Sequence, residues 1–114
     1  MTETQFREAV ADCVARLKET LERLKARGIA LDVARPIRHS FRAPTAEAAE
    51  QLAIGLKYRG IRVVEGPAAA GPHFALKAEI FCPPSLAADE PQVEILVRLA
   101  TIHESEYVGW EAGD

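Results

Sequence analysis

The sequence has few of the features that mark membrane or secreted proteins. It contains no run of roughly 18 apolar residues, the length that a membrane-spanning helix needs, and its first ten residues, MTETQFREAV, place acids where a signal peptide would have basic residues. Its only two cysteines, Cys13 and Cys82, lie far apart and form no C-x-x-C motif. We therefore expect a cytoplasmic protein without membrane association, in which both thiols are free and largely buried.

The residue patterns on which catalysis and cofactor binding usually depend are also missing. The three histidines, His39, His73 and His103, are not spaced as metal ligands are, and His39 alternates with apolar residues as a core histidine does. No serine lies in a G-x-S-x-G or S-x-x-K motif, and no glycine-rich phosphate loop is present. We expect no catalytic residue, no metal site and no cofactor, and hence a protein that is not an enzyme.

What the chain does contain is the composition of an ordinary soluble domain. Its 114 residues are 48% hydrophobic and 27% charged, values close to the average for globular proteins. A chain of this length normally folds as one domain around a single core. The sequence thus predicts a compact protein that folds unaided.

Charge is distributed unevenly along the chain. Residues 1–42 carry nine basic and six acidic side chains, a net charge of +3, whereas residues 43–114 carry five basic and eleven acidic ones, a net charge of −6. The acids of the last third are Glu79, Asp89, Glu90, Glu94, Glu104, Glu106, Glu111 and Asp114, and Arg98 is the only basic residue after Glu79. Such an excess is typical of a solvated face, and it would also suit docking to a basic partner.

An amphipathic helix is predicted at the N-terminus. Residues 3–27 lack glycine and proline, and apolar side chains recur at alternating spacings of four and three, after which Gly28 can end the helix. The stripe consists of Val10, Val14, Leu17, Leu21 and Leu24. It also fits a short heptad pattern, so the helix either packs on its own domain or pairs with a second chain. We expect a monomer or a weak homodimer.

The rest of the chain alternates between strand and helix patterns. A strand at 36–43, with Ile37, His39 and Phe41 on one face, precedes a helix that Thr45 begins and Gly60 ends. A short strand at 61–65 and a turn at 66–72 lead to a strand at 73–82. A second helix follows Asp89, with Ile95, Leu99 and Ile102 widening its apolar face, and EYVGW forms a last edge strand.

This order predicts an α+β protein with a ferredoxin-like βαββαβ sandwich and an extra N-terminal helix. We divide the chain into the N-terminal amphipathic helix and connector, residues 1–34, and the ferredoxin-like domain, residues 35–114. The outward positions of the two long strands offer Arg38, Arg42, Lys77 and Phe81 without the pair of aromatic residues that stacks RNA bases in related folds. We therefore expect no direct binding of nucleic acid.

Three segments resemble the family called regulator of ribonuclease E activity B, or RraB. They are IRHSFRAPTAEAAEQLAIGLKYRGIRVVE, FALKAEIFCPPSLAADEPQVEILVRLA and EYVGWE, the last similar to an E-Y-D-G-W motif of the family, with Val108 at the position of the acid. The resemblance implies the same ferredoxin-like fold with an added helix. It also implies a non-catalytic regulator that binds and inhibits a ribonuclease E-type endonuclease.

Candidate partner-binding residues follow from the last motif and from the acidic excess. Tyr107 and Trp110 are large amphipathic rings that either anchor the C-terminus or form a binding hot spot. The expected contact residues are Glu106, Tyr107, Gly109, Trp110, Glu111, Asp89 and Glu90. A small-molecule-binding or structural interaction domain is the alternative, because this fold carries many unrelated functions.

Overall fold

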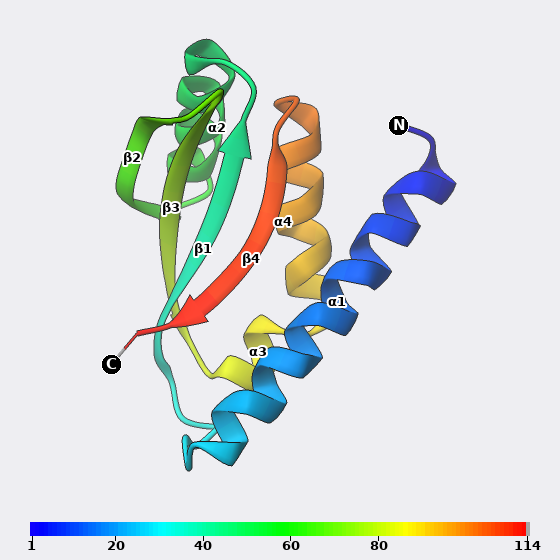
Figure 1. Cartoon of the computed structure of the whole chain (residues 1–114), viewed down its shortest axis with the longest axis vertical. Coiled ribbons are helices and arrows are strands. Elements are labelled where there is room, and N and C mark those ends of the chain that lie inside the picture. The colour runs from blue at the N-terminus through cyan, green and yellow to red at the C-terminus, as the bar shows by residue number, and fades with distance from the viewer. Residues whose placement is uncertain (114) are drawn as a thin grey trace.

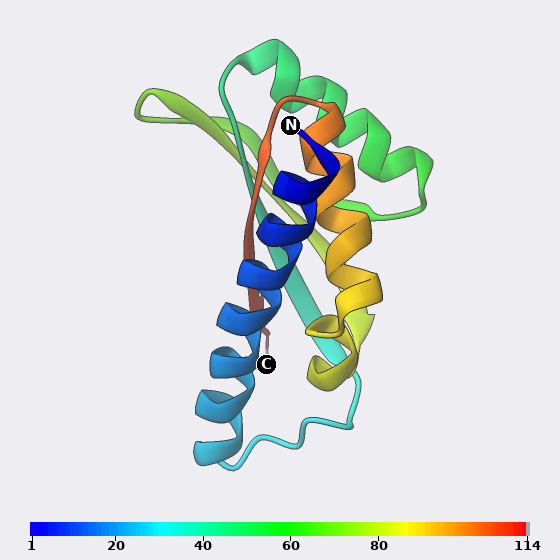
Figure 2. The same cartoon turned by 90° about the vertical axis from the view of Figure 1, so that its right-hand side faces the viewer.

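A computed structural model describes residues 1–113 and shows four antiparallel strands covered on one face by helices (Figures 1 and 2). The elements are α1 (Glu3–Ala26), β1 (Arg35–Ala43), α2 (Ala46–Tyr58), β2 (Arg62–Ala70), β3 (His73–Cys82), α3 (Pro84–Ala87), α4 (Glu90–Ile102) and β4 (Glu106–Ala112). The strand order is β2-β3-β1-β4. The predicted ferredoxin-like α+β fold is therefore confirmed, whereas Asp114, counted above among the acids, lies outside the described residues.

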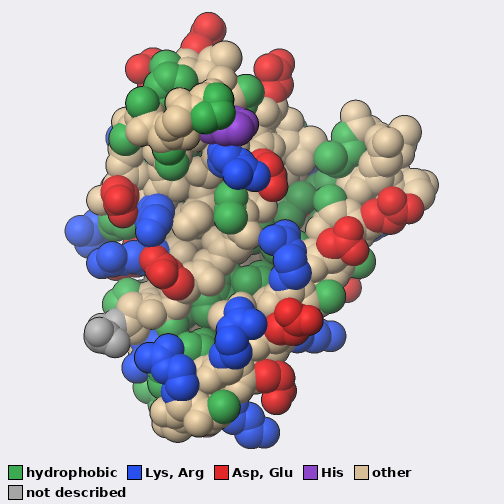
Figure 3. Space-filling view, in the orientation of Figure 1, with side chains coloured by type: hydrophobic (Ala, Val, Ile, Leu, Met, Phe, Trp, Pro, Cys, Tyr) green, Lys and Arg blue, Asp and Glu red, His purple; other side chains and the backbone are tan. Residues whose placement is uncertain are grey.

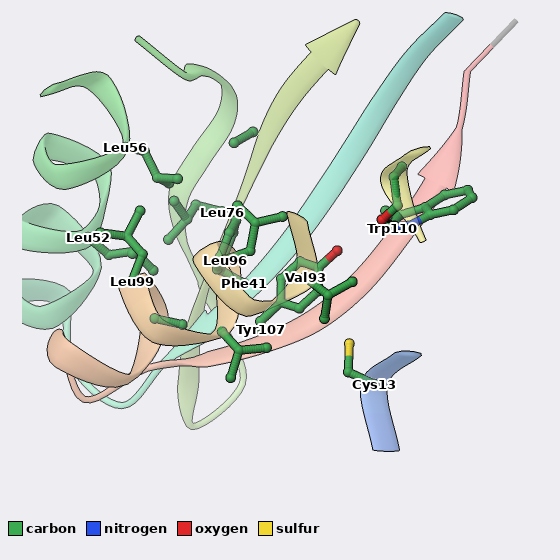
Figure 4. Packing of buried hydrophobic residues seen from close by; sticks show 14 of the residues in the cluster. Cys13, Phe41, Leu52, Leu56, Leu76, Val93, Leu96, Leu99, Tyr107 and Trp110 are labelled. Atoms are coloured by element: carbon green, nitrogen blue, oxygen red, sulfur yellow. Dashed lines mark hydrogen bonds between the residues drawn. The ribbon is translucent and has the colours of Figure 1, made fainter. Parts of the chain in front are cut away.

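The core lies between the sheet and the helix layer. Ile37, His39 and Phe41 alternate inward along β1, as their period of two predicts. The side chain of Thr45 accepts a hydrogen bond from the amide of Ala48 and so begins α2 as expected. Figure 4 shows the leucines of α2 and α4 packed with Phe41, Leu76 and Tyr107; those it labels are Leu52, Leu56, Leu96 and Leu99.

Helix α1 packs on its own chain. Its buried side chains are Phe6, Val10, Cys13, Leu17 and Leu24, whereas Val14 and Leu21 of the predicted stripe are only partly buried. The helix lies beside α4 and the edge of β4 (Figure 2). The Arg98 guanidinium lies 4.1 Å from the centre of the Phe6 ring, a favourable cation–π contact. Arg7 of α1 also pairs with Glu94 of α4, and its hydrogen bond holds the pKa of the Glu94 carboxyl below its usual value. The apolar stripe of α1 is thus used within the chain.

The second strand is longer than predicted. We expected a strand at 61–65 and a turn through 66–72, but β2 continues to Ala70, where Ala68, Ala69 and Ala70 pair with β3, and the turn is confined to Gly71 and Pro72. Two register shifts interrupt the pairing, one between Val63 and Glu65 and one that spans the glycine and proline between Glu65 and Ala68. An edge strand tolerates such residues at a bulge, because one side of its backbone needs no partner strand. The resulting hairpin curls away from α2 and α4 (Figure 2).

Two further predictions about the helices need correction. Helix α3 was not expected, because its four residues are too few to show a period. Ile95, Leu99 and Ile102 were expected to widen the buried face of α4, yet Ile95 and Ile102 are 44% and 64% exposed, and only Leu99 is buried.

Among residues 1–113, no helix is both long enough and apolar enough to cross a membrane.

Candidate protein-binding surface

The C-terminal strand β4 contains an irregularity that orients its aromatic residues. In its pairing with β1, Gly109 is opposite Ser40 but Tyr107 is opposite Phe41, so Val108 is an extra residue in the ladder. This bulge turns both Tyr107 and Trp110 toward the core, although they are three positions apart. Gly109 has a φ of 135°, which side-chain-bearing residues rarely adopt. The bulge therefore depends on Gly109.

Tyr107 forms a buried pair with His39. A hydrogen bond of 2.7 Å joins the Tyr107 hydroxyl to Nδ1 of His39, and the Tyr107 ring centre lies 5.3 Å from that of Phe41. Burial lowers the pKa of His39 to about 4 and raises that of Tyr107 above its usual value. Both side chains are therefore neutral at pH 7. Within residues 1–113, Nε2 of His39 has no hydrogen-bond partner.

We predict that Tyr107→Phe destabilises the protein by about 1–3 kcal/mol, because it leaves both nitrogens of the buried His39 imidazole without a hydrogen-bond partner among residues 1–113. Urea unfolding followed by circular dichroism measures this loss. The matched control is Tyr58→Phe, since Tyr58 is 92% exposed and its hydroxyl faces water. Equal stabilities of the two variants would show that the hydrogen bond contributes nothing.

Trp110 connects β4 to the short helix α3. Its side chain is 7% exposed, and its indole Nε1–H donates a hydrogen bond of 3.1 Å to the carbonyl oxygen of Ala87. Figure 4 shows the Trp110 ring between β4 and α3. Tyr107 and Trp110, both expected at a partner-binding site, thus have the burial and internal hydrogen bonds of groups that hold β4 in place.

The acids of β4 lie on the opposite, open face of the sheet. Glu106 pairs with Arg42 at 2.9 Å and Glu111 pairs with Lys77 at 3.1 Å. A third ion pair, Arg38–Glu79 at 3.4 Å, lies on the same face. Figure 3 looks onto this face and shows basic and acidic side chains interspersed over it. The structure does not bring all the candidate acids together, because Asp89 and Glu90 lie exposed at the start of α4.

A hollow of about 400 Å³ separates α1 from this open face. Its lining includes Arg16, Thr20 and Arg23 of α1, Ser40 of β1 and Lys77 of β3. Arg16 donates a hydrogen bond of 3.4 Å to the carbonyl of Val108, so α1 is tied to the bulge. These α1 residues were not predicted to belong to the site, although they lie next to Leu17, which the amphipathic pattern of the helix predicted to be buried.

The described residues carry little reactive chemistry. Burial raises the pKa of the Cys13 and Cys82 thiols, so neither is ionised appreciably at neutral pH. Both are free; Cys13 is buried as expected, whereas Cys82 is only partly buried. Among residues 1–113, no group of three or more His, Cys, Asp or Glu side chains is placed to hold a metal ion.

A comparison with known protein families gives a match. The sequence model of the family described as "Regulator of ribonuclease activity B" matches residues 15–112, which include the second half of α1 and all four strands of the sheet. A search of curated proteins finds no match.

Proposed function

Because the chain belongs to the family of regulators of ribonuclease activity B, we propose that it is a non-catalytic protein that binds a ribonuclease of the ribonuclease E type and inhibits its cleavage of RNA. The family match over residues 15–112 is the observation that carries this proposal. The lack of an ionised thiol or a metal-binding cluster among the described residues is compatible with it. Such a regulator would act in the cytoplasm, where its partner cleaves RNA.

Strand β4 and the start of α4 supply the proposed contact surface. Glu106 and Glu111 are 61% and 64% exposed, so a basic partner can reach both carboxylates and compete with the cations that pair with them. Gly109 lets the partner approach the backbone closely, while Tyr107 and Trp110 hold the strand from beneath. Asp89 and Glu90 provide a second acidic contact. Such charges mainly raise the rate of association, and salt weakens their effect.

The test of this surface is a charge reversal with a matched control. The double variant Glu106→Lys, Glu111→Lys should bind the ribonuclease of the same organism several-fold more weakly at low salt, and the difference should shrink as salt is added. The control is Glu47→Lys, Glu50→Lys on α2, which changes the net charge equally at exposed positions elsewhere. Calorimetry measures the affinities, and thermal melts show that both variants are folded.

Two outcomes would contradict the proposal. If the wild-type protein forms no complex with the ribonuclease at low salt, the proposed partner is wrong. If both double variants weaken binding equally, net charge rather than the β4 surface determines the affinity.

A further inference from the structure

A groove runs along α4 on the side where that helix meets the end of α2. One hollow of about 440 Å³ is lined by residues that include Ile61, Ile80, Phe81 and Ile95. A second, of about 370 Å³, is lined by residues that include Ile95, Leu99 and Ile102. The two hollows share Arg59 and Ile95, so they lie next to each other along α4. We call these two adjoining hollows the α4 groove.

The α4 groove exposes apolar side chains that the fold leaves uncovered. Ile102 is 64% exposed and Ile95 is 44% exposed, although the apolar pattern of α4 predicted that both isoleucines would be buried. Ile95 and Ile102 are seven residues apart on one helix, a separation of about 10.5 Å along its axis. Exposed apolar side chains that gather in a groove with charged residues around it are typical of a protein-binding site.

The charge that remains uncompensated at the α4 groove is positive. Arg59 lines both hollows, is exposed, and forms no ion pair with any residue from 1 to 113. The two acids of the lining are already engaged, since Glu79 pairs with Arg38 and Glu94 pairs with Arg7 and Arg98. A ligand that complements the groove therefore carries a carboxylate among apolar side chains.

We propose that the α4 groove binds an amphipathic helix of a protein partner, with apolar side chains at i, i+3 and i+7 and an acidic residue between them. The i to i+7 distance in such a helix matches the separation of Ile95 and Ile102. The carboxylate meets Arg59, whose planar guanidinium can hold it with two hydrogen bonds. This inference rests on the proposed function in one respect, namely that the partner tested first is the ribonuclease.

The first experiment uses three groove variants and one control. Each groove variant should weaken the affinity for the ribonuclease, measured by calorimetry, at least tenfold. Ile95→Glu and Ile102→Glu place a charge in the apolar contact, and Arg59→Glu removes the cation that meets the partner's carboxylate. Val33→Glu is the control, since Val33 is 57% exposed and lies in the connector between α1 and β1. All four positions are exposed, so thermal melts should match the wild type. If the groove variants bind the ribonuclease as tightly as the wild type does, the proposal that the groove is a binding site is wrong, while the ribonuclease remains the partner.

The second experiment tests the groove without the ribonuclease. A synthetic helical peptide of about fifteen residues, with leucines at i, i+3 and i+7 and glutamate at i+4, is titrated while amide chemical shifts are recorded. Saturable shifts that are absent with a scrambled peptide, and that are confined to the groove residues Arg59, Ile61, Ile80, Ile95, Leu99 and Ile102, support the proposal. Equal shifts with both peptides, or none, overturn it even if the ribonuclease binds. If wild-type protein sediments as a dimer that Ile95→Glu dissociates, the occupant is a second copy and the proposal is wrong.

Discussion

The Trp110→Ala variant is expected to lose about 3–5 kcal/mol of stability, which is a large part of the total for a domain of this size. The indole is 7% exposed, so its removal leaves a cavity between β4 and α3. The same substitution removes the hydrogen bond to the buried carbonyl of Ala87. Urea unfolding followed by circular dichroism measures the loss, since this variant has no tryptophan fluorescence.

Trp110→Phe separates the two contributions. Phenylalanine restores most of the ring volume but cannot donate to Ala87, so this variant should lose less than Trp110→Ala. Wild-type stability in the alanine variant would contradict the anchoring role. A Trp110 variant that is fully folded and yet fails to bind the ribonuclease would instead assign the ring to the interface, because a folding defect could not then explain the loss.

His39 is expected to make the protein less stable at acid pH. Burial lowers the pKa of His39 from its ordinary value of 6.5 to about 4, so the folded state resists protonation that the unfolded chain accepts. The contribution to stability is fully present above pH 6.5 and is lost as the pH falls toward 4. The difference between these two values corresponds to about 3 kcal/mol. Urea unfolding at several pH values between 7 and 4 measures this loss.

A matched pair of variants isolates the histidine from other acid-sensitive groups. His39→Gln removes the titrating imidazole, so its stability should fall less than that of the wild type between pH 6.5 and 4. Ile37→Val lowers stability at the neighbouring inward position of β1 without removing a titrating group, and it should keep the wild-type pH dependence. Identical pH dependence in His39→Gln and the wild type would show that His39 is not held neutral by burial.

Local patterns were sufficient to predict most of the fold. Ile37, His39 and Phe41 alternate cleanly because β1 lies in the middle of the sheet with one face on the core. The predicted start and end of α2 are also confirmed, because Thr45 and Gly60 act through short-range backbone geometry. The predicted strand at 61–65 is shorter than β2, because β2 pairs with β3 across two irregularities. A short stretch of sequence does not show that the backbone resumes its pairing beyond them.

The candidate site was harder to predict, because a single extra residue reverses the faces of a strand. A strict period of two would place Tyr107 and Gly109 on one face and Trp110 on the other. The bulge at Val108 instead turns Tyr107 and Trp110 inward together, and Gly109 was its only signal in the sequence. Ion pairs such as Glu111–Lys77 join residues 34 positions apart, so they depend on strand order and are invisible to local patterns.

Inhibition can be measured as the rate at which the ribonuclease of the same organism cleaves a fluorogenic RNA in the presence of increasing amounts of this protein. We expect a rate that falls and then levels off once the protein is in excess, while an unrelated ribonuclease acting on the same RNA is unaffected. That second enzyme excludes inhibition by sequestration of the RNA. A rate that stays constant up to a large excess of folded protein would contradict the proposal that this chain inhibits the ribonuclease.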